Sequence, residues 1–102
     1  MNEIEFRKWL SQKGTTKKVQ SDFVSRLKRL ERELNQCDID EQYRIDKCNY
    51  LMSLFYRMGN NDSMKQHKNI NLPIGKYYMS TYRYALKKYI KYCDETVTLT
   101  KQ

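Results

Sequence analysis

The chain has 102 residues, with 20 Lys and Arg against 12 Asp and Glu and a formal net charge of +8. This length predicts one domain with one modest core, and this charge favours polyanionic partners. No apolar run approaches the ~20 residues of a membrane-spanning helix, and no secretory signal peptide is recognisable. We therefore expect a cytoplasmic protein that does not enter a membrane.

Residues 3–13 are predicted to form a first helix. Asn2 can cap its start, and Gly14 occupies the place that glycine often takes just after a helix ends. Its apolar stripe consists of Phe6, Trp9 and Leu10.

A second, longer helix is predicted from Lys17 to Gln36, with Thr15 or Thr16 as its cap. It contains no Gly or Pro, and its apolar side chains recur in steps of four, four, three and four residues, which is the helical period. These side chains are Val19, Phe23, Leu27, Leu30 and Leu34.

A third helix is predicted from Asp38 or Asp40 to the turn-forming residues 59–62. Its apolar stripe consists of Ile45, Cys48, Leu51, Met52 and Phe55. Residues 59–75, which follow, show no periodicity and contain the only proline and the only histidine of the chain. A loop of this length is typical of a functional or a disordered segment.

A fourth helix is predicted to begin at Ser80 or Thr81, or as early as Tyr77, and to end near Glu95. Its apolar stripe consists of Tyr82, Leu86, Tyr89, Ile90 and Cys93. We assign residues 1–95 to one helical module and residues 96–102 to a flexible tail or linker. The predicted fold class is all-α: a compact bundle of about four helices with a long basic loop before the last helix.

Positive charge is concentrated towards the two ends of the chain. Residues 1–36 have nine basic and five acidic side chains, residues 37–62 have three and five, and residues 63–102 have eight and two. We expect the two ends to pack together and pool their cations on one face.

The stretch GKYYMSTYRYALKKYIKY, residues 75–92, contains six tyrosines and five Lys or Arg. Tyr82 and Tyr89 belong to the apolar stripe, so we expect their rings in the core. Tyr77, Tyr78, Tyr84 and Tyr92 lie off the stripe or before it, so we expect some of these rings to be partly exposed. Exposed rings among lysines can stack on bases or form a protein interface.

Two groups of cations are candidates for phosphate contacts. Arg83, Lys87 and Lys91 are four residues apart and form one ridge on the fourth helix. Residues 15–18 offer hydroxyls, free N–H groups and two ammonium groups at a helix start, although a solvated charge cluster is the alternative. The complete predicted nucleic-acid-binding set is Thr15, Thr16, Lys17, Lys18, Lys65, Lys68, Lys76, Tyr77, Tyr78, Arg83, Tyr84, Lys87, Lys88 and Lys91.

Catalysis is not predicted. His67 has no neighbouring nucleophile or metal-ligand spacing, and no Gly-rich phosphate loop is present. Three widely spaced cysteines, Cys37, Cys48 and Cys93, form neither a disulfide framework nor a metal motif. We expect no enzyme activity, no cofactor, no metal and no small-molecule substrate.

The segment EFRKWLSQKGTTKKVQSDFVSRLKRLE, residues 5–31, resembles the start of the SAM-like core-binding module of tyrosine recombinases and phage integrases. Two later segments, DEQYRIDKCNYLMSLFYRM and STYRYALKKYIKYCDE, are similar to N-terminal helical modules that precede nuclease domains in some bacterial restriction-type proteins. The resemblance implies double-stranded DNA as the partner, with residues 15–18 facing phosphates and Arg83, Lys87 and Lys88 on the binding helix. It does not extend to the recombinase catalytic domain.

The sequence thus predicts a non-catalytic DNA-binding module. The alternative is a small phage or mobile-element protein that binds and inhibits a host nuclease or defence protein. The basic face of such a protein would sit where nucleic acid normally sits, or its acidic residues 38–46 would imitate DNA. An oligomerising structural domain is a third interpretation.

Overall fold

The structure is a computed structural model in which residues 1–100 are described, and their side chains through Thr96. The chain forms six α-helices and one 3-10 helix, and residues 1–100 contain no strand, which confirms the all-α prediction. The elements are α1 (Glu3–Gln12), α2 (Lys17–Glu33), α3 (Ile39–Asp46), α4 (Asn49–Ser53), η1 (Tyr56–Gly59), α5 (Asp62–Lys65) and α6 (Met79–Thr100).

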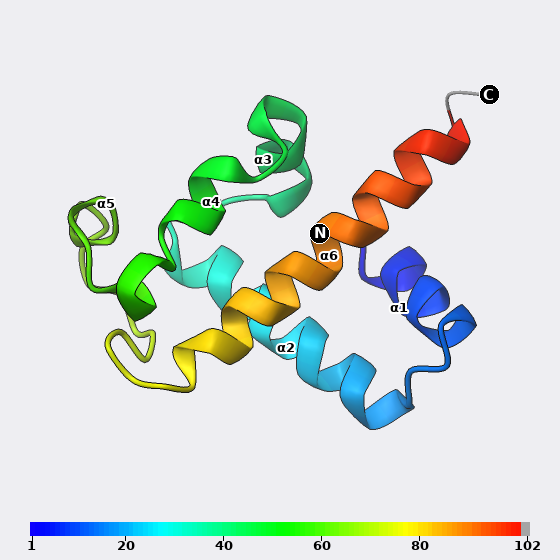
Figure 1. Cartoon of the computed structure of the whole chain (residues 1–102), viewed down its shortest axis with the longest axis horizontal. Coiled ribbons are helices and arrows are strands. Elements are labelled where there is room, and N and C mark those ends of the chain that lie inside the picture. The colour runs from blue at the N-terminus through cyan, green and yellow to red at the C-terminus, as the bar shows by residue number, and fades with distance from the viewer. Residues whose placement is uncertain (101–102) are drawn as a thin grey trace.

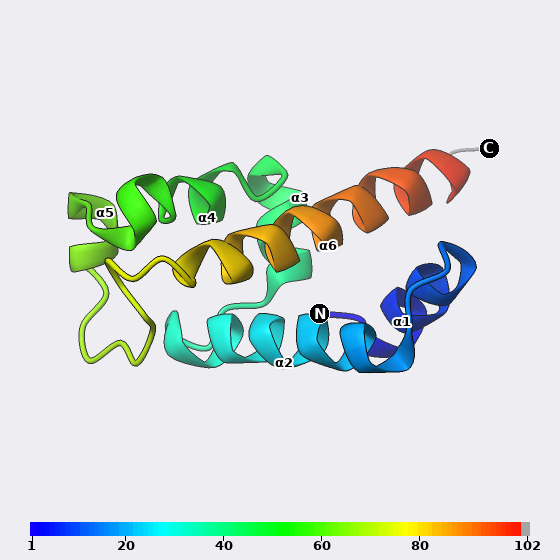
Figure 2. The ribbon, with the colours of Figure 1, turned by 60° about the horizontal axis from the view of Figure 1, so that its bottom comes forward.

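The two longest helices, α2 and α6, cross each other at the centre of the molecule (Figure 1, Figure 2). The first turns of α6 lie near the end of α2, where Arg29 donates a hydrogen bond to the Tyr82 hydroxyl at 2.7 Å. Further along α6, the Tyr84 ring lies 5.7 Å from the Phe23 ring. The last part of α6 packs on α1, so the start and the end of the chain do come together.

Aromatic packing joins α1 to α6. The Phe6 ring lies 4.9 Å from Tyr89 and 5.5 Å from Tyr92, centroid to centroid, and all three side chains are buried. The stripe predicted for α1 is confirmed, as is the burial of Tyr82 and Tyr89. Tyr92 was not assigned to a stripe, but it is buried as well because α1 covers its side of α6.

The buried face of α2 is rotated from the predicted stripe at its first turns. Val19 is exposed, whereas Gln20 and Val24 are buried. The Gln20 amide donates to the Ser11 hydroxyl at 3.0 Å and to the Thr15 carbonyl at 2.8 Å. These bonds satisfy the buried polar side chain of Gln20 beside the end of α1.

The prediction of one continuous third helix is wrong. The chain leaves the helical conformation at Lys47 and Cys48, whose φ angles are 57° and 64°, and resumes as α4 in a new direction. Ile45, which was placed on the stripe, is 65% exposed because the break changes which face of the segment packs inward. Cys48, Leu51 and Phe55 are buried as predicted.

The segment before α6 contains one short helix, α5, followed by a loop over residues 66–78. Leu72 and Pro73 of this loop are buried, and Gly75 donates its N–H to the Met58 carbonyl at 2.8 Å. The loop therefore docks on the protein.

At its C-terminal end, α6 continues through residues 96–100, which were assigned to a tail or linker. The remaining tail residues, 101–102, lie outside the described part of the chain.

Candidate nucleic-acid interface

Basic residues dominate the part of the chain that leads into α6. Between Phe55 and Lys91 the sequence has eight Lys or Arg and a single acidic residue, Asp62. Seven of the eight cations are exposed, and Lys88 is half-buried. This part of the chain comprises η1, α5, the loop and the first turns of α6, and η1, α5 and the loop gather at one end of the molecule (Figure 1).

The carboxylates of the protein pair with a different set of cations. Among the described residues, the Lys and Arg side chains that form ion pairs lie on α1, α2, α3 and the turn after α1. The pairs are Arg7–Glu3, Lys8–Glu5, Lys13–Glu95, Lys28–Glu3, Arg32–Glu33 and Arg44–Glu41. Among all the described residues, no cation of the predicted nucleic-acid-binding set forms an ion pair with a carboxylate. Lys91 affects the Glu95 carboxylate from a greater distance. Hydrogen bonds from Trp9 and Lys13 are the main causes of the lowered Glu95 pKa, and the charge of Lys91 adds weakly to this lowering.

The α6 ridge, which we define as Arg83, Lys87 and Lys91, lies along the exposed face of α6. With 1.5 Å of rise per residue, its two ends are ~12 Å apart. Tyr84 lies beside the ridge, 55% exposed, with its ring against Phe23 of α2. The ridge therefore presents three charges in a row next to a supported aromatic ring.

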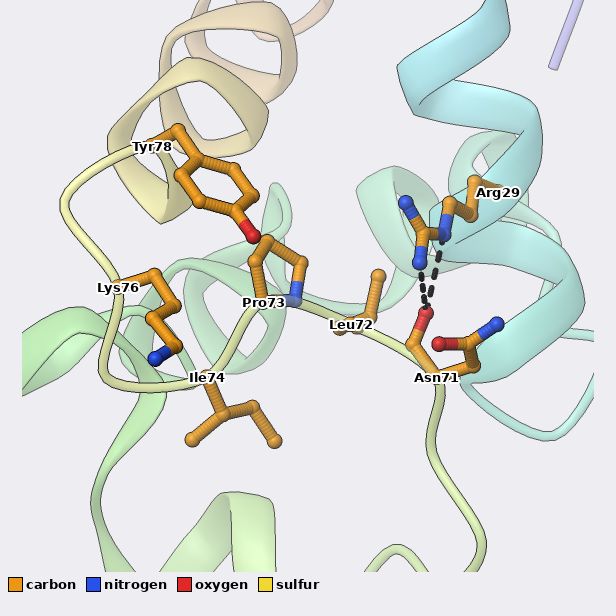
Figure 3. A pocket seen from close by; sticks show the side chains of 7 residues that line it. All are labelled: Arg29, Asn71, Leu72, Pro73, Ile74, Lys76 and Tyr78. Atoms are coloured by element: carbon orange, nitrogen blue, oxygen red, sulfur yellow. Dashed lines mark hydrogen bonds between the residues drawn. The ribbon is translucent and has the colours of Figure 1, made fainter.

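A second surface, the loop surface, consists of Lys76, Tyr77 and Tyr78. Tyr77 is 80% exposed, and its ring makes an edge-on contact with Tyr78 at 5.5 Å. Figure 3 shows the pocket beside them, which has a volume of about 270 Å³ and lies between the Tyr78 ring and the guanidinium of Arg29. The remaining lining residues are Asn71, Leu72, Pro73, Ile74 and Lys76.

Arg29 fixes the position of this loop. Its Nε and Nη2 donate to the Asn71 carbonyl at 2.9 and 2.5 Å (Figure 3), while its Nη1 donates to Tyr82 of α6. The Asn71 N–H in turn donates to the Glu33 carboxylate at 2.8 Å, and this bond is the main cause of the lowered Glu33 pKa. The loop is thus held against α2 at Asn71, and Arg29 also joins α2 to α6.

Residues 15–18 form a separate cluster at the start of α2. The Thr16 hydroxyl caps the helix by accepting a hydrogen bond from the Val19 N–H at 3.3 Å, and the Thr15 N–H donates to Leu10. Lys17 lies ~18 Å along α2 from Arg29, at 1.5 Å per residue. No hydrogen bond, ion pair or ring contact of the described residues joins this cluster to α6, so the predicted cations divide into two groups.

Lys65 and Lys68 are exposed on either side of His67. His67 Nε2 lies 2.9 Å from the Tyr50 hydroxyl, and its Nδ1 lies 3.3 Å from the Asn35 amide nitrogen. Its visible role is to connect the start of the loop to α4 and to the end of α2.

Within residues 1–100, no three His, Cys, Asp or Glu side chains come together as a possible metal site.

The acidic segment around Asp38 does not present a row of free charges. The Met1 amine donates to Glu31 at 2.9 Å and to Asp38 at 3.0 Å. Burial of this amine lowers its pKa, but the hydrogen bonds outweigh burial and raise the pKa to about 10. Asp40 accepts a hydrogen bond from Tyr89, and Glu41 pairs with Arg44. Asp38 and Glu41 therefore each have a cationic partner within the protein.

Comparison of the chain with protein-family models, curated proteins and solved structures found no match. Among the residues described, no helix is both long enough and apolar enough to cross a membrane.

Sequence reasoning missed Arg29 as a residue that positions the loop. Its partner Asn71 is 42 residues away, so no local pattern could reveal the contact. It also missed Tyr56 and Arg57, an exposed aromatic–cation pair beside the loop. Their adjacency in the sequence, just before the turn at residues 59–62, was a signal that could have been read.

Proposed function

We propose that the protein is a non-catalytic DNA-binding module that contacts the phosphate backbone of a duplex through the α6 ridge and the loop surface. The observation that carries the proposal is the division of the cations into two sets. The protein's own carboxylates pair with cations elsewhere, while those of the ridge and the loop stay exposed without a carboxylate partner.

Electrostatics supplies most of the affinity in this mechanism. Each Lys or Arg that neutralises a phosphate releases condensed counterions, and this gain does not depend on base sequence. The ridge is straight and ~12 Å long, which suits successive phosphates along one strand. Tyr84 and Tyr77 add contacts to sugars or bases from positions next to these cations.

The resemblance to the SAM-like core-binding module agrees with this proposal, because that module also grips DNA while a separate domain performs the chemistry. Under the proposal, residues 15–18 contact phosphates outside the main surface. Thr16 can still donate its hydroxyl hydrogen while its oxygen caps α2.

Titration of labelled duplex DNA at several salt concentrations tests the proposal. If five to eight phosphates are engaged, log K against log salt has a slope of about −4 to −7. Absence of binding at low salt would refute the proposal. A slope near zero would refute the electrostatic mechanism.

A protein partner is the second candidate, and one observation favours it. Met58 and Ile74 are exposed apolar side chains, and the hydrogen bond from the Gly75 N–H to the Met58 carbonyl joins the two segments that carry them. A stoichiometric partner that resists nuclease treatment and is lost from the Met58→Glu variant would favour this candidate over DNA.

A further inference from the structure

A pocket at the end of the molecule, separate from the loop-surface pocket, is lined by η1, the turn after it and α5. It has a volume of about 370 Å³ and is formed by Tyr56, Arg57, Asn60, Asn61, Asp62 and Lys65. Only Lys65 belongs to the set predicted from the sequence. The lining combines an aromatic ring, two cations, two amides and one carboxylate.

We propose that this pocket binds one unpaired nucleotide of a nucleic-acid strand, an inference that rests on the DNA-binding function proposed above. Tyr56 is 66% exposed, and the Arg57 guanidinium lies over its ring, 5.5 Å from the centroid. Bases of unpaired nucleotides stack on aromatic rings and on guanidinium planes. The Tyr56–Arg57 pair offers both surfaces at one place.

The polar side chains of the pocket match the other parts of a nucleotide. The Asn60 side chain makes no hydrogen bond within residues 1–96, so its amide can pair with a base edge. Lys65 is exposed and has no carboxylate partner in the same region, so it can take the phosphate. Asp62 can accept a hydrogen bond from a base amino group, and its charge directs the phosphate to the side of Lys65.

The pocket is held in shape before a ligand arrives. The Asn61 amide donates to the carbonyls of Leu54 and Tyr56 at 3.0 and 2.7 Å, and its oxygen accepts from the Met64 N–H at 2.9 Å. Arg57 and Met58 have φ angles of 54° and 56°, a left-handed turn in which Arg57 lies over Tyr56. A preformed pocket loses less entropy on binding.

The position of the pocket determines which kind of nucleic acid can place a nucleotide in it. The Met58 carbonyl, next to Arg57, accepts the N–H of Gly75, next to Lys76 of the loop surface. A strand on the loop surface can therefore continue into the pocket. A base within a duplex is covered on both faces by its neighbours, so the pocket takes a nucleotide beyond the duplex end, in an overhang or at a gap.

The test compares two labelled probes, a blunt DNA duplex and the same duplex with a short single-stranded thymidine overhang. The wild-type protein is expected to bind the overhang probe at least about fivefold more tightly, the effect of one stacked base. Tyr56→Ala should remove this difference and leave blunt-duplex affinity within about twofold, whereas Tyr56→Phe, which retains the ring, should keep it.

The alternative outcomes separate this inference from the proposed function. Equal binding of both probes by the wild type, or a preference that survives in Tyr56→Ala, would overturn the nucleotide pocket and leave duplex binding intact. Failure to bind either probe at low salt would overturn the DNA-binding function itself. Because Tyr56 is mostly exposed, Tyr56→Ala should melt at the wild-type temperature, which shows that the variant is folded.

Discussion

The hydroxyl of Tyr89 donates a hydrogen bond to Asp40, with 2.5 Å between the two oxygens. The same hydroxyl accepts the backbone N–H of Asn2 at 2.7 Å. One atom of α6 therefore connects the start of the chain with α3. Burial raises the Tyr89 pKa far above the usual value for tyrosine, so the hydroxyl remains a donor at physiological pH.

Tyr89→Phe should lower the free energy of unfolding by about 1–3 kcal/mol, because it leaves the Asn2 N–H without its partner and Asp40 without a donor. Urea unfolding measures the change. Tyr77→Phe is the matched control, since Tyr77 is exposed, and it should shift stability by less than about 0.5 kcal/mol. Equal effects of the two substitutions would contradict the buried connection.

Lys47→Gly should stabilise the protein by about 1 kcal/mol. Lys47 lies in the left-handed region, where a Cβ costs roughly 1–2 kcal/mol, and the flexibility of glycine in the unfolded chain offsets part of the gain. Lys47 directly follows α3 in a left-handed conformation, which glycine most often adopts at a helix end. Thermal unfolding measures the change, with Lys47→Ala as the control that gains nothing. A loss of stability in Lys47→Gly would indicate a continuous helix instead.

This break shows where sequence patterns fail. Periodicity predicted the first, second and last helices because each has one apolar stripe that faces a single core. Ile45 and Cys48 have helical spacing too, but the chain turns between them at residues that are neither Gly nor Pro. Val19 fits the period of α2, yet α1 packs on the side of Gln20. Tertiary packing determines both the break after α3 and the buried face of α2, and the periodicity of one segment contains no information about the elements that pack on it.

The candidate site was predicted in composition but not in arrangement. The exposure of Tyr84 follows from its place on the helical period, and Tyr77 precedes the helix. Whether cations are paired depends on carboxylates far away in the sequence, as in the pair of Lys13 with Glu95. The contact between Arg29 and Asn71, which holds the loop at residues 66–78, also joins residues that are far apart in the sequence.

Arg29→Ala should release the loop at residues 66–78. The variant loses both bonds to the Asn71 carbonyl and the bond to Tyr82, so the amide hydrogens of the loop should exchange at least about tenfold faster, which corresponds to one lost hydrogen bond of ~1.4 kcal/mol. Hydrogen exchange followed by mass spectrometry measures this. Lys28→Ala is the control, because Lys28 pairs with Glu3 away from the loop. Unchanged loop exchange in Arg29→Ala would show that other contacts hold the loop.

The three cysteines should react slowly in the folded protein. Burial raises the pKa of Cys37 to about 11 and those of Cys48 and Cys93 to about 12, from an ordinary value of 9.0. Two pKa units mean roughly a hundredfold less thiolate at pH 8. Labelling with a thiol reagent, with and without urea, measures the ratio. Fast labelling of Cys48 or Cys93 without urea would contradict the core.

These thiols also make stability depend on pH. Their stabilising contribution is complete below the unfolded pKa of 9.0 and is lost as pH rises towards 11 and 12, because the unfolded chain ionises first. Urea unfolding should therefore show stability falling above pH 9. Replacement of Cys37 by Ser should reduce the slope without removing it, and a flat profile in the wild type would contradict the raised pKa values.

The most direct measurement compares two triple variants that lose the same charge. One carries Arg83→Gln, Lys87→Gln and Lys91→Gln in the α6 ridge, and the other carries Lys8→Gln, Arg32→Gln and Arg44→Gln, whose side chains pair with Glu5, Glu33 and Glu41. Both are titrated with duplex DNA over a range of salt concentrations, after their melting temperatures have been matched to the wild type.

If the unpaired cations of α6 grip phosphates, the first variant loses more than about tenfold in affinity, and its salt slope becomes shallower by roughly two to three units. The second variant should stay close to the wild type in both quantities. Equal losses in the two variants would mean that DNA responds only to net charge, which would contradict a defined phosphate-binding surface on α6.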